Sequence, residues 1–132
     1  MKTRDIRNAM KSTLASANIL PLVVENGAAR ARPYLDVKVA TVSRENNLLE
    51  GGSFQREQGM MDVTVVVDEG TYSGASNDYA DEVAALFPEG LTIAAPGGDV
   101  VITAVPDIRP GFNVEAEYRT PVMIRYEAVP NA

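Results

Sequence analysis

The chain has 132 residues, 45% of them hydrophobic, which suits one domain with a core of its own. Its net charge is −6 and it contains no histidine, so binding to duplex DNA or to an anionic membrane is disfavoured, because affinity for phosphates comes mainly from Lys and Arg. It contains no cysteine, which excludes disulfides and thiolate metal sites.

The N-terminal segment 1–11 is basic and amphipathic and lacks the apolar stretch of a signal peptide. No run of about 18 apolar residues occurs, so no transmembrane helix is expected. We therefore expect a protein of the cytosol without a membrane partner.

The first predicted element is an amphipathic helix over residues 4–17. Its apolar side chains recur at helical spacing: Ile6, Met10, Leu14 and Ala17. Thr3 is the predicted N-cap, because its hydroxyl can accept a hydrogen bond from an amide of the first turn. Pro21 prevents the helix from continuing.

Two strands are predicted next, over residues 35–41 and 61–67, because apolar and polar side chains alternate in both. The segment Ser43–Gly59 between them has weak structural signals and is predicted to be a long loop. Two adjacent leucines, Leu48 and Leu49, lie in it among polar and flexible residues. Either they fold back on the domain or they contact a partner, since loops often carry function.

A second helix is predicted over residues 76–87, with this apolar stripe: Tyr79, Ala80, Val83, Ala84 and Phe87. Pro88 and Gly90 end it. A short strand over residues 91–95 is expected to pair with a strand over residues 100–105 through a turn at residues 96–99. The strand 100–105 is apolar on both faces, which predicts a central position in the sheet.

The last predicted strand is long and covers residues 112–126. Alternation places one set of side chains on its buried face: Phe112, Val114, Ala116, Tyr118, Thr120, Val122, Ile124 and Tyr126. The charged side chains take the other face: Glu115, Glu117, Arg119, Arg125 and Glu127. A strand of that length would span roughly 50 Å, so we expect a bulge or break near Pro121, which has no N–H for a ladder.

The order of helix, two strands, helix and three strands shows no regular βαβ alternation. We therefore predict an α+β fold in which two helices pack on one mainly antiparallel sheet of about four to five strands. Residues 1–132 are expected to form a single domain, with a long loop at residues 43–59 and a short flexible C-terminal tail.

A search for catalytic, cofactor-binding or metal-binding residues identifies none. The chain has no histidine or cysteine, which are the commonest general base and the thiol nucleophile. A serine nucleophile would need a lysine, and no serine is spaced to indicate such a dyad with one of the three lysines: Lys2, Lys11 and Lys38. Residues 70–74 resemble a phosphate-binding loop only superficially, because the Gly-Lys-Ser/Thr of such a loop is missing.

Glu115 and Glu117 could hold a cation or act as an acid–base pair, since both lie on one face of the predicted strand. The solvent face of a half-buried sheet explains them more simply. The sequence therefore predicts a protein that is not an enzyme.

The two predicted helices carry opposite charges. Arg4, Arg7 and Lys11 share one face of the first helix. The second helix has an acidic face formed by Asp78, Asp81 and Glu82. Two ordinary solvated faces would look the same. The alternative is that the basic helix of one subunit contacts the acidic helix of its neighbour, a head-to-tail contact that can close into a ring.

Five segments stand out by their order and spacing: Ile6–Met10, Pro33–Val37, Arg56–Val63, Ala80–Gly90 and Tyr118–Tyr126. Taken together, residues 5–128 resemble the tail terminator (tail completion) proteins of siphophages. One departure is Leu22–Asn26, where that family often has an aromatic residue.

The resemblance implies a structural virion protein that forms a hexameric ring on the head-proximal end of the tail tube. Such a ring stops tube polymerisation and provides the docking surface for the head–tail connector, and DNA only passes through its centre. The implied partners are further copies of the chain, the tail tube protein and the connector. The protein would assemble in the host cytoplasm and remain in the virion.

The candidate subunit or tube interface combines the charged helix residues with the residues in and beside the predicted loop: Arg4, Arg7, Lys11, Arg44, Glu45, Leu48, Leu49, Arg56, Asp78, Asp81 and Glu82. Two alternatives stay open. One is another neck or tail-tube component, such as a connector or minor tail protein. The other is a small-ligand-binding or enzymatic α+β domain, which a concave apolar pocket with convergent polar groups would support.

Overall fold

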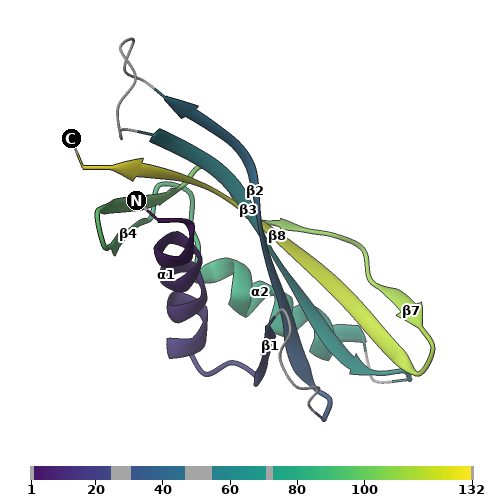
Figure 1. The fold of residues 1–132 in the computed structure, drawn as a ribbon. Coiled ribbons are helices and arrows are strands. Elements are labelled where there is room, and N and C mark those ends of the chain that lie inside the picture. The colour runs from purple at the N-terminus through teal and green to yellow at the C-terminus, as the bar shows by residue number, and fades with distance from the viewer. Residues whose placement is uncertain (1, 25–30, 47–54, 71–72, 132) are drawn as a thin grey trace.

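The computed structural model describes residues 2–24, 31–46, 55–70 and 73–131. In this part of the chain, two helices, α1 (Thr3–Ser16) and α2 (Ser73–Ala85), lie on one side of a curled sheet (Figure 1). The sheet has eight strands: β1 (Leu22–Val24), β2 (Tyr34–Asn46), β3 (Gln55–Asp68), β4 (Thr92–Ala95), β5 (Gly98–Ile102), β6 (Asp107–Ile108), β7 (Phe112–Val114) and β8 (Glu117–Pro130).

The strands follow the order β1-β2-β3-β8-β5-β4, and β6 and β7 also pair with β8. β1 runs parallel to β2, whereas the other pairs are antiparallel, so the sheet is mixed. The predicted α+β fold, with two helices on about four to five mainly antiparallel strands, is therefore wrong. The protein is mostly β, and its eight-stranded sheet curls into a half-barrel. The strand number was underestimated because β1, β6 and β7 have only two or three residues, too few for a period-2 pattern.

Helix α1 closely matches the helix predicted over residues 4–17, but its N-cap differs. Lys2 is the N-cap in extended backbone, and Thr3 is the first helical residue. The helix ends before Pro21, because Asn18 adopts a left-handed conformation with φ of 52°. Ile6, Met10 and Leu14 of the predicted stripe are buried, as their spacing predicts, whereas Ala17 is the C-cap and is exposed.

The predicted loop at residues 43–59 is wrong, because both of its ends are strand. β2 continues to Asn46 and β3 begins at Gln55, and these two residues lie opposite each other. The end of this hairpin projects beyond the helices (Figure 1) and its sequence is polar, so it carries no apolar alternation, although Glu57 is buried and accepts a hydrogen bond from Thr3 of α1. A bulge between Thr41 and Ser43 shifts the register and adds to the bend of the strand.

The predicted strand over residues 112–126 is also wrong, because the chain reverses direction inside it. β7 and β8 form a hairpin in which Val114 lies opposite Glu117, and Glu115 in the turn has φ of 54°. The break expected near Pro121 does not occur. Pro121 lies within β8, and its carbonyl accepts a hydrogen bond from the Arg109 N–H at 2.9 Å, where β6 has just ended. The ladder stops at that point, so the missing proline N–H costs no hydrogen bond.

The remaining elements follow the sequence more closely. β4 and β5 form the predicted hairpin, with Ala95 opposite Gly98. The predicted strand 100–105 ends at Ile102, and Val105 is 71% exposed. Helix α2 begins and ends slightly earlier than residues 76–87, and Phe87 is buried in the turn that follows the helix.

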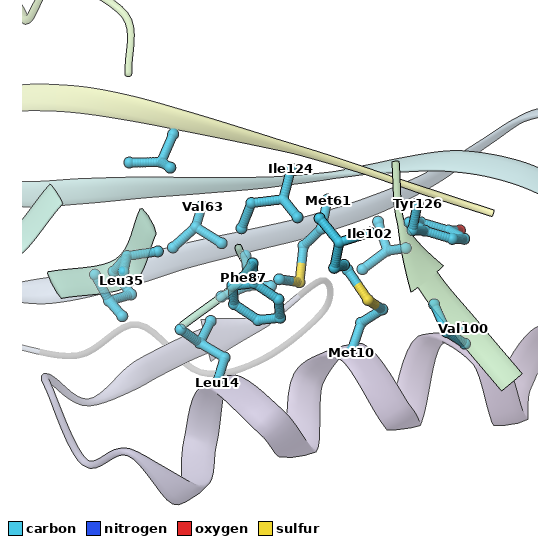
Figure 2. Packing of buried hydrophobic residues seen from close by; sticks show 14 of the residues in the cluster. Met10, Leu14, Leu35, Met61, Val63, Phe87, Val100, Ile102, Ile124 and Tyr126 are labelled. Atoms are coloured by element: carbon cyan, nitrogen blue, oxygen red, sulfur yellow. The ribbon is translucent and has the colours of Figure 1, made fainter. Parts of the chain in front are cut away.

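The core lies between the concave face of the sheet and the two helices. Figure 2 shows side chains of α1 pointing toward those of the strands, in a cluster that includes Met10, Leu14, Leu35, Met61, Phe87, Ile102, Ile124 and Tyr126. The one buried hydroxyl pair in the described residues, Ser76 on α2 and Thr120 on β8, is joined at 2.6 Å. Gly59 lies opposite Tyr126, and a Cβ on Gly59 would overlap the tyrosine ring.

Candidate assembly surfaces

Helix α1 has two flanks beside its buried stripe. One flank, with Asn8 and Ser12, forms one wall of a groove of about 540 Å³ that opens to solvent. The other wall of the groove is formed by Ile93, Ala94 and Pro96 near the β4 edge. The opposite flank carries the predicted basic residues Arg4, Arg7 and Lys11.

These three basic residues differ in exposure. Arg4 is exposed, whereas Arg7 and Lys11 are half-buried. The Nε atom of Arg7 is buried and has no hydrogen-bond partner within the described residues. A buried donor of this kind is unfavourable in the isolated subunit, because it has lost water without gaining a partner.

The predicted acidic residues Asp78, Asp81 and Glu82 are all exposed on α2. They lie on the side opposite Ala80 and Val83, which are buried against the sheet. Neither these carboxylates nor the basic residues of α1 form an ion pair in the part of the chain that the structure describes. The structure therefore does not bring the two charged faces together within one subunit.

The other predicted interface residues lie at the end of the β2–β3 hairpin. Arg44 and Glu45 belong to β2, and Glu45 faces Arg56 of β3 in the register. Arg56 has a partner in its own subunit, because its Nε lies 3.0 Å from Glu127 Oε1 on β8. Leu48 and Leu49, and the side chains of Arg44 and Glu45, lie outside the described residues.

A polar network on the outer face of the sheet, away from the helices, was not predicted. We call it the outer-face network; it consists of Arg32, Tyr34, Asp36, Asp68, Glu117 and Arg119. At its centre, Arg119 donates to Glu117 Oε1 at 2.9 Å and to Asp36 Oδ2 at 3.2 Å. The Tyr34 hydroxyl donates to the second Glu117 oxygen at 3.2 Å, and Arg32 lies 2.6 Å from Asp68. The network thus joins β2, β3 and β8.

The network shifts the ionisation of its members. Hydrogen bonds from Arg119, opposed by burial, lower the pKa of Glu117 below its ordinary value. Burial and the nearby Glu117 charge raise the pKa of Tyr34. Burial alone would lower the pKa of Arg119, but the hydrogen bond and charge of Glu117 outweigh it and the pKa is raised. At neutral pH the network therefore consists of paired charges and a neutral tyrosine.

An exposed apolar arm formed by residues 105–114 was not predicted either. Its exposed side chains are Val105, Ile108, Phe112 and Val114. The strand predicted over residues 112–126 put two of them on the buried face. Pro106 and Pro110 on either side of β6 are the signal that could have indicated short, interrupted strands there.

The described residues also include features that bear on the binding of an ion or a small molecule. No group of three acidic side chains among them is placed to hold a metal ion. A second groove, of about 330 Å³, lies between Val42, Met60 and Arg125 on the sheet, and it too opens to solvent. Within the same residues, no helix is both long and apolar enough to cross a bilayer.

The comparison with protein families decides the identity. The family model for the phage tail terminator protein matches the sequence over residues 5–126, which is nearly the whole chain. The chain belongs to the phage tail terminator family. This family is a structural component of the virion and is not known as an enzyme. The resemblance inferred from the five segments of the sequence is thereby confirmed.

Solved structures support the fold. One solved structure has a TM-score of 0.83 at 21% identity, and the match covers 100% of this chain and 99% of that chain. Another comes from the virion of a native gene transfer agent particle, with a TM-score of 0.62 at 11% identity, and covers 97% of this chain and 96% of that chain. At these identities the likeness concerns the fold alone. No curated protein matches the chain in sequence.

Family membership makes this chain a structural protein of a phage tail, located in the virion, where it assembles with other virion proteins. Its functional residues are therefore to be sought on its surface, where they can contact those proteins.

Proposed function

We propose that this chain forms a ring, a hexamer in the finished tail, that caps the head-proximal end of the tail tube. The cap stops tube polymerisation and offers its other face to the head–tail connector. The observation that carries the proposal is the family match over residues 5–126. Assembly takes place in the host cytoplasm, and the protein then stays in the tail.

Two further observations support this role. The chain of similar fold in the gene transfer agent particle is, like a tail terminator, part of a virion. The net charge of −6 suits a ring through which DNA passes, because a strongly basic lining would retain DNA by displacing its counterions.

The projecting end of the β2–β3 hairpin is the surface that we assign to the tube or to the next subunit. It carries Arg44, Glu45 and Arg56 and leads to the adjacent leucines Leu48 and Leu49. A projecting hairpin can add contacts to a partner without disturbing the core of its own subunit.

Electron microscopy of the full-length protein mixed with polymerising tail tube protein tests the proposal. We expect rings at one end of each tube and shorter tubes as more of the chain is added. Tubes that grow to the same length with and without the chain would refute it.

Another neck or tail-tube component is the alternative, because sharing a fold with a chain of the gene transfer agent virion does not specify a position within a particle. The same experiment separates the two, since a tube component would be incorporated along the tube whereas a terminator binds one end.

A further inference from the structure

The sheet and the helices of the subunit differ in how many of their charged side chains form ion pairs. On the sheet and directly beside it, four arginines have carboxylate partners within 3.5 Å: Arg32, Arg56, Arg109 and Arg119. On α1, Arg4, Arg7 and Lys11 have none among the described residues, and neither have the three carboxylates of α2. Several charged groups on and beside the sheet are therefore paired within the subunit, although Lys38, Asp99 and Arg125 are not, whereas none of these six helix groups has an ion pair in the described residues.

Arg7 adds a second, independent observation. Its Nε is buried without a hydrogen-bond partner in the described residues, although the side chain reaches the surface. In native proteins the large majority of buried hydrogen-bond donors have a partner, so an unpaired donor is unusual. The buried Nε itself is out of reach of a second subunit, but Arg7 as a whole is half-buried and has no carboxylate partner in the described residues, so a carboxylate from a neighbouring copy can pair with its charge.

We propose that the basic flank of α1, formed by Arg4, Arg7 and Lys11, binds the acidic face of α2, formed by Asp78, Asp81 and Glu82, on a second copy of the chain. Charge complementarity selects this occupant, since each face presents three charges of opposite sign. On the basic flank Arg4 is exposed, and Arg7 and Lys11 are half-buried. This inference rests on the proposed ring and names the contact between its subunits.

In the proposed ring the contact is head-to-tail. The two faces belong to different helices, so each subunit can use α1 toward one neighbour and α2 toward the other. Repeated contacts of this kind close into a ring when the rotation between subunits permits. The charges set the register of the contact, and the apolar surface around them contributes to affinity.

Charge reversal in the full-length protein tests the proposal, with assembly measured by sedimentation velocity and light scattering. Arg7→Glu and Asp81→Arg should each weaken association at least about tenfold, because attraction becomes repulsion. The double variant R7E/D81R should recover most of the loss. An equimolar mixture of the two single variants should recover it as well, since the reversed faces complement each other. Raising the salt from about 0.05 M to about 1 M should weaken assembly of the wild type.

Matched controls come from charges elsewhere on the surface. Arg125→Glu and Asp99→Arg make the same changes at exposed positions of β8 and β5 that have no ion pair in the described residues, and they should leave assembly unchanged. Arg4→Glu replaces Arg7→Glu in the series if thermal unfolding shows that the half-buried position does not tolerate glutamate.

The outcomes separate this inference from the proposed function. If every charge-reversal variant of α1 and α2 still forms rings that cap tubes, the inference is overturned and the proposed function is unaffected. If the wild type forms rings that never bind tubes, and the charge reversals abolish these rings, the contact is supported and the capping role is refuted. A double variant no better than the worse single one would also overturn the pairing.

Discussion

Removing either hydroxyl of the buried Ser76–Thr120 pair should destabilise the protein, whereas removing both should not. The two oxygens lie 2.6 Å apart, and Ser76 and Thr120 are 0% and 1% exposed. Ser76→Ala or Thr120→Val alone leaves the other hydroxyl buried without that partner, which costs about 1–3 kcal/mol. The cost of the serine change is reduced by about 0.5 kcal/mol, because alanine is the better helix former.

The double variant S76A/T120V replaces both hydroxyls by apolar groups of similar shape and should be nearly neutral. The two single costs therefore should not add, and the coupling between the sites should be about 2 kcal/mol or more. For a chain of this size, each kcal/mol shifts the melting temperature by about 3–5 °C.

Urea unfolding followed by circular dichroism measures all four members of this cycle. Thr64→Val serves as the control, because Thr64 is half-buried and its only side-chain hydrogen bond in the described residues is a longer one, of 3.3 Å, to Asp62. It should cost less than about 1 kcal/mol. If the double variant loses the sum of the two single costs, the hydroxyls act independently and the reasoning is refuted.

Three further predictions follow from single positions. Gly59→Ala should lower the free energy of unfolding by about 1–3 kcal/mol, because its Cβ would overlap the Tyr126 ring; equal stability of the two proteins in urea would contradict this. Glu115→Gly should raise the free energy of unfolding by about 0.5–1 kcal/mol, because glycine adopts the φ of 54° without strain, and a lower melting temperature would argue against it. Glu117 has a lowered pKa, so its contribution to stability is present above the ordinary carboxyl pKa of 4.5 and is lost as the pH falls through the folded value. Glu117→Gln should therefore be less stable than wild type at pH 7 and lose less stability in acid; urea unfolding over a pH series measures this, and equal stability of the two proteins at pH 7 would contradict it.

Several elements were predictable because their side chains face the core at a regular spacing. Ile6, Met10 and Leu14 recur at helical spacing on α1, and all three are buried. The alternation from Thr120 to Tyr126 also holds, because this part of β8 lies in the middle of the sheet with helices on one side only. Where one face of an element is buried, the sequence carries a period.

The errors occur where no core enforces a period. The end of the β2–β3 hairpin projects past the helices, and residues 43–46 and 55–58 are polar, so they resemble a loop although their backbones are paired and Glu57 is buried. At the β7–β8 turn the opposite happens: Phe112 and Val114 continue the alternation of β8 across a reversal of the chain. Glu115 occupies a position that usually requires glycine, so no turn residue marks the reversal.

The charged surfaces of the two helices could be predicted, and their role as an interface stays a prediction. Charges at helical spacing indicated the basic flank of α1 and the acidic face of α2, and both exist as helical surfaces in the structure. The outer-face network could not be predicted, because it joins Asp36 to Arg119 across 83 positions of sequence through the pairing of β2, β3 and β8. Such pairs depend on strand register, which the sequence did not provide.

The charges of the outer-face network and the charges of the helices should therefore affect different properties of the protein. The outer-face network lies where the sheet has no helix over it, and its ion pairs hold three strands together, so changing Arg119 or Glu117 should alter the stability of the subunit. The charges of α1 and α2 have no partners in the described part of the subunit, so reversing Asp81 should leave stability nearly unchanged and alter assembly instead. The opposite result would be that Asp81→Arg is unstable and that Arg119→Met is stable but does not assemble. That result would show that the outer face of the sheet, rather than the helices, forms the contact between subunits.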